Sequence, residues 1–258
     1  MSFVGKVLAS IGIGAAKVDT ILSRERLVPG ENAEGVVRIQ GGHTQQEVGS
    51  IYFSLYTSYQ LKLDGKRLPQ TAELVRYRLT KPVMARPGGL KEIPFSFPIP
   101  YDTPVTIGNT KVWVKTGLEI DHALDPIDRD YITIAPSDVM AAVLRALGEL
   151  GFKLHNADCE HAKGIFRSRL PLVQAFGFLP AGDGPFSDRI KGVEAVFRPQ
   201  ADSTEVILQI DRRTGGNRST LADMEKPDES LIRIKVTDRD IPSMTSFLQY
   251  VIERCIKK

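Results

Sequence analysis

Ile93-Pro94-Phe95-Ser96-Phe97-Pro98-Ile99-Pro100 is the stretch that decides the fold. Each of its prolines fixes φ and removes a backbone hydrogen-bond donor, so the segment belongs on an edge strand or in an extended crossing segment. Phe95, Phe97 and Ile99 alternate with the opposite face, which predicts that one side is buried. We therefore expect a β-sandwich whose edge is capped by proline, an architecture that favours binding over catalysis.

Further strand signals surround this stretch in the first half of the chain. Pro29-Gly30 predicts a type II turn, because proline presets φ and glycine accepts a positive φ, and the turn leads into a strand at 35–39. Apolar and polar residues alternate again over 48–59, 75–79 and 111–115. About seven short strands separated by turn signals predict an all-β sandwich.

The second half combines strands with two helices. Ser137 or Asp138 can cap a helix over 138–150, whose apolar stripe stops at Gly151. Strand patterns follow at 152–163, 192–197, 205–210 and 231–236, and a second helical stripe covers 243–256. The predicted fold is therefore mainly β, with two helices in the C-terminal half.

The length of 258 residues favours two domains over one. A composition shift marks the boundary, because acidic residues crowd around Pro126 before a strand resumes at Tyr131. We predict one β-sandwich over residues 1–134 and a second, with the helices, over residues 135–258.

The acidic stretch allows three interpretations. It is a solvated loop, or a charge cluster that pairs with arginines between the domains, or a cation site. The last lacks the spacing and the terminal glutamate of a calcium loop. The candidates for polar contacts between the domains are Asp125, Asp128, Asp130, Arg76, Arg78 and Arg129.

The charge and cysteine content limit the function classes. The net charge is only +3, and the basic residues are scattered among acids, so no nucleic-acid-binding stripe is present. Two cysteines do not make a disulfide framework, which favours a reducing cytoplasm. No apolar run approaches the ~18 residues that a membrane span needs.

The strongest candidate for chemistry is the set His155, Cys159 and His161, whose even spacing would place all three on one face of a strand. Imidazole and thiolate are good zinc ligands, but residues spread along one strand cannot close a tetrahedron without a turn between them. No phosphate loop, nucleophile elbow or zinc-protease helix occurs. We predict no catalytic residues, no metal site and no cofactor.

The N-terminal residues suggest an amphipathic segment. Phe3, Val4, Val7, Leu8 and Ile11 recur at helical spacing, which predicts a short helix. Its apolar face either docks on its own domain or contacts a membrane or a partner.

Several of these segments resemble a known family. Residues 12–20 (Gly-Ile-Gly-Ala-Ala-Lys-Val-Asp-Thr), Val28-Pro29-Gly30-Glu31 and residues 93–100 are similar to the bacterial sporulation-control proteins of the stage-zero M type. Residues 125–132, 206–213 and 228–230 extend the resemblance over essentially the whole chain. It implies an arrestin-like fold of two β-sandwiches and a non-enzymatic, cytoplasmic protein that acts by binding other proteins. The stretch 170–184 departs from the family pattern.

Together these observations predict a cytoplasmic adaptor or regulator that controls sporulation or a cell-division-type programme. Its partners would be proteins, with a homodimer as one option, and not nucleic acid. The alternative is a peripheral membrane protein that uses the N-terminal segment. An unpaired strand edge would bind the partner. The predicted edge residues are Val18, Thr20, Leu22, Val206, Ile207 and Leu208.

Overall fold

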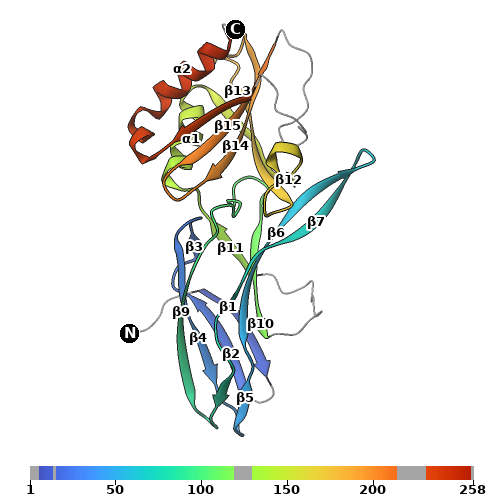
Figure 1. Cartoon of the computed structure of the whole chain (residues 1–258), viewed down its shortest axis with the longest axis vertical. Coiled ribbons are helices and arrows are strands. Elements are labelled where there is room, and N and C mark those ends of the chain that lie inside the picture. The colour runs from blue at the N-terminus through green and yellow to red at the C-terminus, as the bar shows by residue number, and fades with distance from the viewer. Residues whose placement is uncertain (1–5, 14–15, 119–129, 214–230, 257–258) are drawn as a thin grey trace. The chain divides into compact units, whose positions relative to one another are not determined.

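The computed structural model describes residues 6–13, 16–118, 130–213 and 231–256. This part of the chain forms two compact units, each built from several segments. The first comprises Met1–Thr57, Glu73–Thr103 and Lys111–Ala135, and the second comprises Ser58–Ala72, Pro104–Thr110 and Pro136–Lys258. The fold is mainly β with two helices in the C-terminal half, as predicted (Figure 1). That 1–134 and 135–258 are separate sandwich domains stays a prediction.

One layer of the first unit is a four-stranded antiparallel sheet. Its strands are β1 (Lys6–Ile13), β2 (Ala16–Leu22), β4 (Asn32–Gln40) and β9 (Leu90–Pro98), in that spatial order. The predicted turn precedes β4: Gly30 has φ +90°, and the amide of Glu31 donates to the carbonyl of Val28 at 3.1 Å. A Cβ at Gly30 would lie 2.3 Å from the ring of Tyr101, so glycine is required there.

The other layer of the first unit is built on β6 (Ile51–Leu63), whose residues 51–57 pair with β10 (Val112–Leu118). Strand β11 (Asp130–Ile134) joins β10, and β3 (Arg26–Leu27) joins β11 in parallel. Strand β7 (Lys66–Arg78) pairs with β6. A separate two-stranded ribbon consists of β5 (Gln46–Val48) and β8 (Val83–Ala85).

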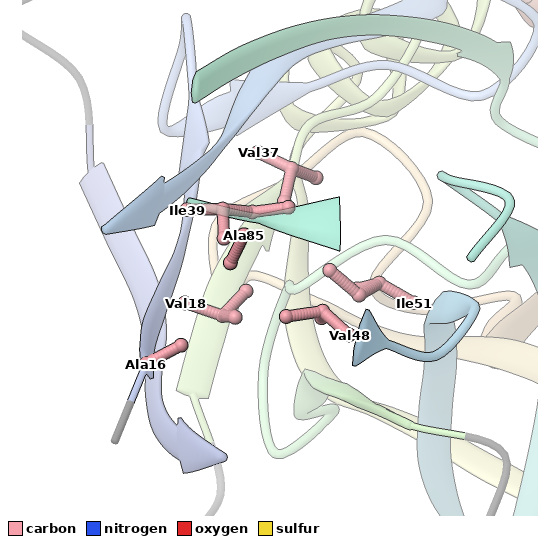
Figure 2. Close-up of a cluster of buried hydrophobic side chains, with 7 residues drawn as sticks. All are labelled: Ala16, Val18, Val37, Ile39, Val48, Ile51 and Ala85. Carbon is pink, nitrogen blue, oxygen red and sulfur yellow. The ribbon is translucent and has the colours of Figure 1, made fainter. Parts of the chain in front are cut away.

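Apolar side chains from both layers fill the core of the first unit. The ring of Phe97, from β9, lies 4.7 Å from the ring of Phe53, from β6. Figure 2 shows a second part of this core, where side chains of β2 and β4 point toward those of Val48, Ile51 and Ala85. The members of this cluster are Ala16, Val18, Val37, Ile39, Val48, Ile51 and Ala85.

The proline-rich stretch lies where the sequence predicts it. Strand β9 ends its sheet, and β4 is its ladder partner among the described strands. Phe97 and Ile99 are buried and Phe95 is half-buried, whereas Pro94 and Pro98 are exposed. The predicted alternation of buried and exposed residues is therefore confirmed. Pro94 and Pro98 occupy an edge strand, whose outer side has no neighbouring strand that would need a backbone N–H donor.

The second unit contains a five-stranded antiparallel sheet that follows sequence order. Its strands are β12 (Phe152–His161), β13 (Leu172–Pro180), β14 (Ile190–Pro199), β15 (Thr204–Arg212) and β16 (Leu231–Val236). Residues 104–110 lie against this sheet, because the side-chain amide of Gln174 bonds both the amide and the carbonyl of Val105 and also the hydroxyl of Thr110.

Both faces of this sheet are covered. On one face, Ile207 and Val196 pack with Phe166 from the short 3₁₀ helix η1 (Gly164–Phe166). Helices α1 (Asp138–Glu149) and α2 (Met244–Ile256) lie on the other side of the sheet, α2 preceded by the 3₁₀ helix η3 (Asp238–Ser243) (Figure 1).

Both predicted helices are confirmed, with their ends where the sequence places them. The hydroxyl of Ser137 accepts the amide of Met140 at 3.3 Å, which caps α1. Gly151, with φ +85°, follows its C-terminus. Val143 and Leu147 are fully buried on the apolar side of this helix.

The predicted N-terminal helix is wrong over the residues that the structure describes. Lys6–Ile13 form β1, which pairs antiparallel with β2. The sequence also fits a strand, because apolar residues recur at every second position: Val7, Ala9, Ile11 and Ile13. Pairing with β2 adds a ladder of hydrogen bonds, whereas a short helix on its own is only marginally stable. The predicted residues Phe3 and Val4 lie outside the described part.

We predict that Phe97→Ala lowers the free energy of unfolding by about 3–5 kcal/mol, because it removes the ring that joins the two layers of the first unit and leaves a cavity. Ser96→Ala, one residue away on the exposed face, is the control and should change stability by less than about 0.5 kcal/mol. Urea denaturation followed by circular dichroism measures both. Equal effects of the two substitutions would contradict this account of the core.

Candidate interaction surface

The structure separates the three residues considered for metal binding or catalysis. His155 is exposed at a β-bulge between Leu154 and Asn156. Cys159 is buried, with its Sγ 3.8 Å from Oγ1 of Thr110, and His161 stacks on the ring of Tyr59. The bulge breaks the even spacing between His155 and the other two residues, while Cys159 and His161 stay two positions apart in a regular part of β12. Within the described ranges, no three His, Cys, Asp or Glu residues gather into a group that could hold a metal ion.

The candidates for contacts between the domains have mixed outcomes. Asp125, Asp128 and Arg129 lie outside the described residues. Asp130 begins β11, and Arg78 is exposed at the end of β7. The guanidinium of Arg76 lies 4.5 Å from the centre of the Tyr52 ring, in its own unit. The role of these residues between the domains stays a prediction.

Both predicted interaction edges are wrong, because each lies inside a sheet. Strand β2, which carries Val18, Thr20 and Leu22, has β1 on one side and β4 on the other. Strand β15, with Val206, Ile207 and Leu208, lies between β14 and β16. Their backbone groups are already paired, so neither strand can accept a partner strand. These six residues serve the cores instead, and all are buried.

The ends of β6 and β7 form an exposed hairpin, which we call the hairpin arm (residues 58–72) (Figure 1). Asp64 and Gly65 connect the two strands with φ values of 49° and 75°. Two successive positive φ values mark a type I′ turn, which suits the right-handed twist of a hairpin. Every residue from Lys62 to Thr71 is exposed, and Ala72 is the first buried residue of β7.

The turn fixes which residues face each other along the arm. A two-residue loop places Leu63 opposite Lys66, and the same register places Tyr56 opposite Glu73. The structure agrees, since the hydroxyl of Tyr56 donates to Oε2 of Glu73 at 2.7 Å. Burial, followed by this hydrogen bond, raises the pKa of Tyr56 to about 12.

The arm therefore has one apolar face and one cationic face. Leu61, Leu63 and Leu68 share the apolar face with one cation, Lys66, which the turn places opposite Leu63, and Leu63 and Leu68 are 55% and 39% exposed. Lys62 and Arg67 lie opposite each other on the other face, because facing residues point to the same side of a hairpin. Leucines that gather on one face of an exposed hairpin are a candidate contact surface.

The cationic face borders a small cleft at the base of the arm. Six residues of the second unit line this cleft: Gln60, Lys62, Arg67, Glu160, His161 and Lys163. Strand β12 meets β6 here, where Glu160 pairs with Gln60. Arg67 forms an ion pair with Glu160. The distance from its guanidinium to Oε1 is 3.8 Å, which is longer than the distance in a hydrogen bond.

Sequence reasoning missed the arm, although the signal is present. Asp64-Gly65 is one of the strongest short hairpin signals, and it lies between alternating segments. The alternation recognised at 48–59 and 75–79 lies on either side of it. Continuing that pattern to the Asp-Gly pair would have revealed the hairpin and its two faces.

Within the described residues, no helix is long and apolar enough to cross a membrane.

The family model for SpoOM protein matches residues 4–214 of the chain. The sporulation-control protein spo0M of Bacillus subtilis (strain 168) is 37% identical over 256 residues, which cover 99% of this chain and 98% of that protein. The crystal structure of the Bacillus subtilis protein superposes with a TM-score of 0.78 at 35% identity, covering 95% of this chain and 99% of that one.

We predict that one of the seven tyrosines titrates near pH 12 and that Tyr56→Phe removes this step. The folded pKa is raised, so the stability that this hydroxyl contributes is complete below its ordinary pKa of 10.0 and is lost as the pH rises through about 12. Ultraviolet absorbance titration of the phenolates measures the step. Glu73→Gln should lower that pKa, and an unchanged titration in this variant would contradict the contribution assigned to Glu73.

Proposed function

The chain belongs to the SpoOM protein family, and from this premise we propose that it regulates sporulation, or a related cell-division programme, by binding other proteins. Near-complete coverage of both chains supports carrying the regulatory role from the Bacillus subtilis sporulation-control protein to this one. The proposed site of action is the cytoplasm, in keeping with cysteines that are both free thiols in the structure.

The arrangement of reactive side chains favours binding over catalysis. A nucleophilic pair needs a thiol or hydroxyl within hydrogen-bond reach of a base. The thiol of Cys159 faces Thr110 in a buried site, while His155 is exposed at its bulge and His161 stacks on Tyr59. The raised pKa of Tyr56 has structural causes, first its burial and then its hydrogen bond to Glu73 on the neighbouring strand.

The observation that carries the proposal is the exposure of Leu63 and Leu68 near the turn of the hairpin arm. Full burial of a leucine side chain stabilises a complex by about 1.5–3 kcal/mol, so two of them supply a useful share of a binding free energy. The turn geometry holds their strands in place before binding, which lowers the entropy cost of association. We therefore assign the hairpin arm as the partner-binding element.

We expect the full chain, immobilised and exposed to an extract of the source cell, to retain a defined set of proteins. Leu63→Ser/Leu68→Ser should reduce this capture about tenfold or more, because it removes the apolar contact. Leu90→Ser is the matched control, since Leu90 is 59% exposed on β9 in the other unit. Quantitative mass spectrometry of the retained proteins is the measurement.

Two outcomes would contradict this proposal. Retention of the same proteins by the parent and by the double variant would show that the arm does not bind them. Equal losses in the double variant and in Leu90→Ser would indicate a general effect of removing exposed leucines. Melting temperatures within error of the parent confirm that each variant is folded.

A further inference from the structure

We propose that the outer edge of β16 binds an acidic, extended segment of a protein partner, which adds as a further strand to the sheet of the second unit. This surface is additional to the hairpin arm. Strands β12 and β16 are the first and last strands of that sheet, and β6 of the arm joins it at β12. The inference therefore goes beyond the function proposed for the arm and does not depend on it.

The first argument is the open edge of the sheet. Among the strands that the structure describes, β16 pairs with β15 and ends the sheet. An end strand turns the backbone N–H and C=O groups of alternate residues outward, where an added strand can complete their hydrogen bonds. Strand β16 contains no proline, whereas Pro69 lies in β7 and Pro94 in β9. Its sequence, Leu-Ile-Arg-Ile-Lys-Val, is also rich in residues that favour strands.

The second argument is the charge on one face of this edge. Arg233 and Lys235 lie two positions apart, so they share a face, and both are exposed. Arg233 is opposite the apolar Ile207 in the ladder. Lys235 is opposite Glu205, whose carboxylate already accepts a hydrogen bond from Arg198 at 3.2 Å. In the part of the chain that the structure describes, neither of the two edge cations forms an ion pair. Acidic side chains on an added strand would lie directly beside them.

The other face of the edge is apolar and completes the pattern that a partner must match. Ile232 and Ile234 are half-buried, and they lie opposite Leu208 and Val206 on the side of the sheet that carries the helices. An added strand with apolar residues on this side would bury more of both isoleucines. The segment that fits therefore alternates acidic residues, beside the two cations, with apolar residues on the helix side.

The same charges disfavour a second copy of this chain at the edge. Antiparallel pairing of two β16 strands that keeps the isoleucines on one face brings Arg233 and Lys235 of both copies together on the other. Like charges that lie directly opposite each other destabilise a ladder, and exposed cations are one way in which proteins prevent such pairing. An acidic strand meets no such repulsion, so the edge selects a partner of opposite charge.

The test uses the full chain and a short fluorescein-labelled peptide of alternating glutamate and valine, with glutamine replacing glutamate in the neutral control peptide. We expect the acidic peptide to bind with an affinity that falls as the salt concentration rises. The neutral peptide should bind about tenfold more weakly or less. Arg233→Gln/Lys235→Gln should weaken binding of the acidic peptide by a similar factor. Lys81→Gln/Lys91→Gln removes two exposed lysines of the first unit and should leave binding unchanged. Fluorescence anisotropy is the readout.

Two further acidic peptides test whether the segment pairs as a strand. Each carries N-methyl groups on alternate residues, on the odd positions in one peptide and on the even positions in the other. A strand that pairs along one edge turns only one of these sets of N–H groups toward β16. One peptide should therefore lose binding, and the other should bind as the unmodified peptide does.

Several results would overturn the inference. Equal binding of the acidic and neutral peptides, or equal losses in the two double variants, shows that Arg233 and Lys235 do not select acidic chains. Loss of binding in both N-methylated peptides, or in neither, contradicts pairing along one edge. A dimer in analytical ultracentrifugation that the acidic peptide disperses shows that the edge serves a second copy. Leu63→Ser/Leu68→Ser should bind the peptide as the parent does, so failure of the capture experiment and failure of this one are distinguishable.

Discussion

The contact between Phe97 and Phe53 is the interaction on which the first unit depends. It joins β9, which belongs to the four-stranded sheet, to β6, which belongs to the other layer. The centres of the two rings are 4.7 Å apart. The ring of Tyr77 stacks on the same phenylalanine at 4.5 Å, and its hydroxyl donates to the carbonyl of Pro98 at 2.7 Å. Because Tyr77 belongs to β7, this cluster also fixes the strand that leads to the hairpin arm. One aromatic cluster therefore holds β6, β7 and β9 together within the first unit.

The structure shows why some of this fold was predictable and some was not. The proline-rich strand, the turn at Gly30 and both helices have local causes: φ restriction, positive φ, capping and a stripe of apolar residues. Strand β13 and the N-terminal strand have weaker local patterns. Phe176-Gly177-Phe178 lacks polar alternation because β13 is covered on both faces. Gly177 lies so close to Asn156 that a Cβ would be 2.1 Å from its Oδ1.

The candidate site was harder to predict than the fold, because an edge is defined by neighbours far away in the sequence. Thr20 lies in an alternating segment and Ile207 in a run of buried residues, and nothing local shows whether zero, one or two strands flank them. Burial of alternating residues predicts a strand, but the ladder partners come from β16 and β1, which are distant or weakly patterned. The hairpin arm is the reverse case, since its turn and its two faces are written in a few consecutive residues around Asp64-Gly65.

Proline placement limits strand pairing along the outer sides of β7 and β9. In a two-residue hairpin, the two residues next to the turn form a hydrogen-bonded pair. Pairs without and with mutual hydrogen bonds then alternate along the strands, so Gln60 and Pro69 form a pair without them. The backbone of Gln60 then faces away from β7, which agrees with its pairing to Glu160 of β12. The nitrogen of Pro69 likewise faces the outer side of β7, where a missing donor interrupts any added strand. Pro94 and Pro98 do the same on β9. These prolines blunt the outer sides of β7 and β9, so at these two strands the binding that we propose would rely on side chains, such as those on the two faces of the hairpin arm.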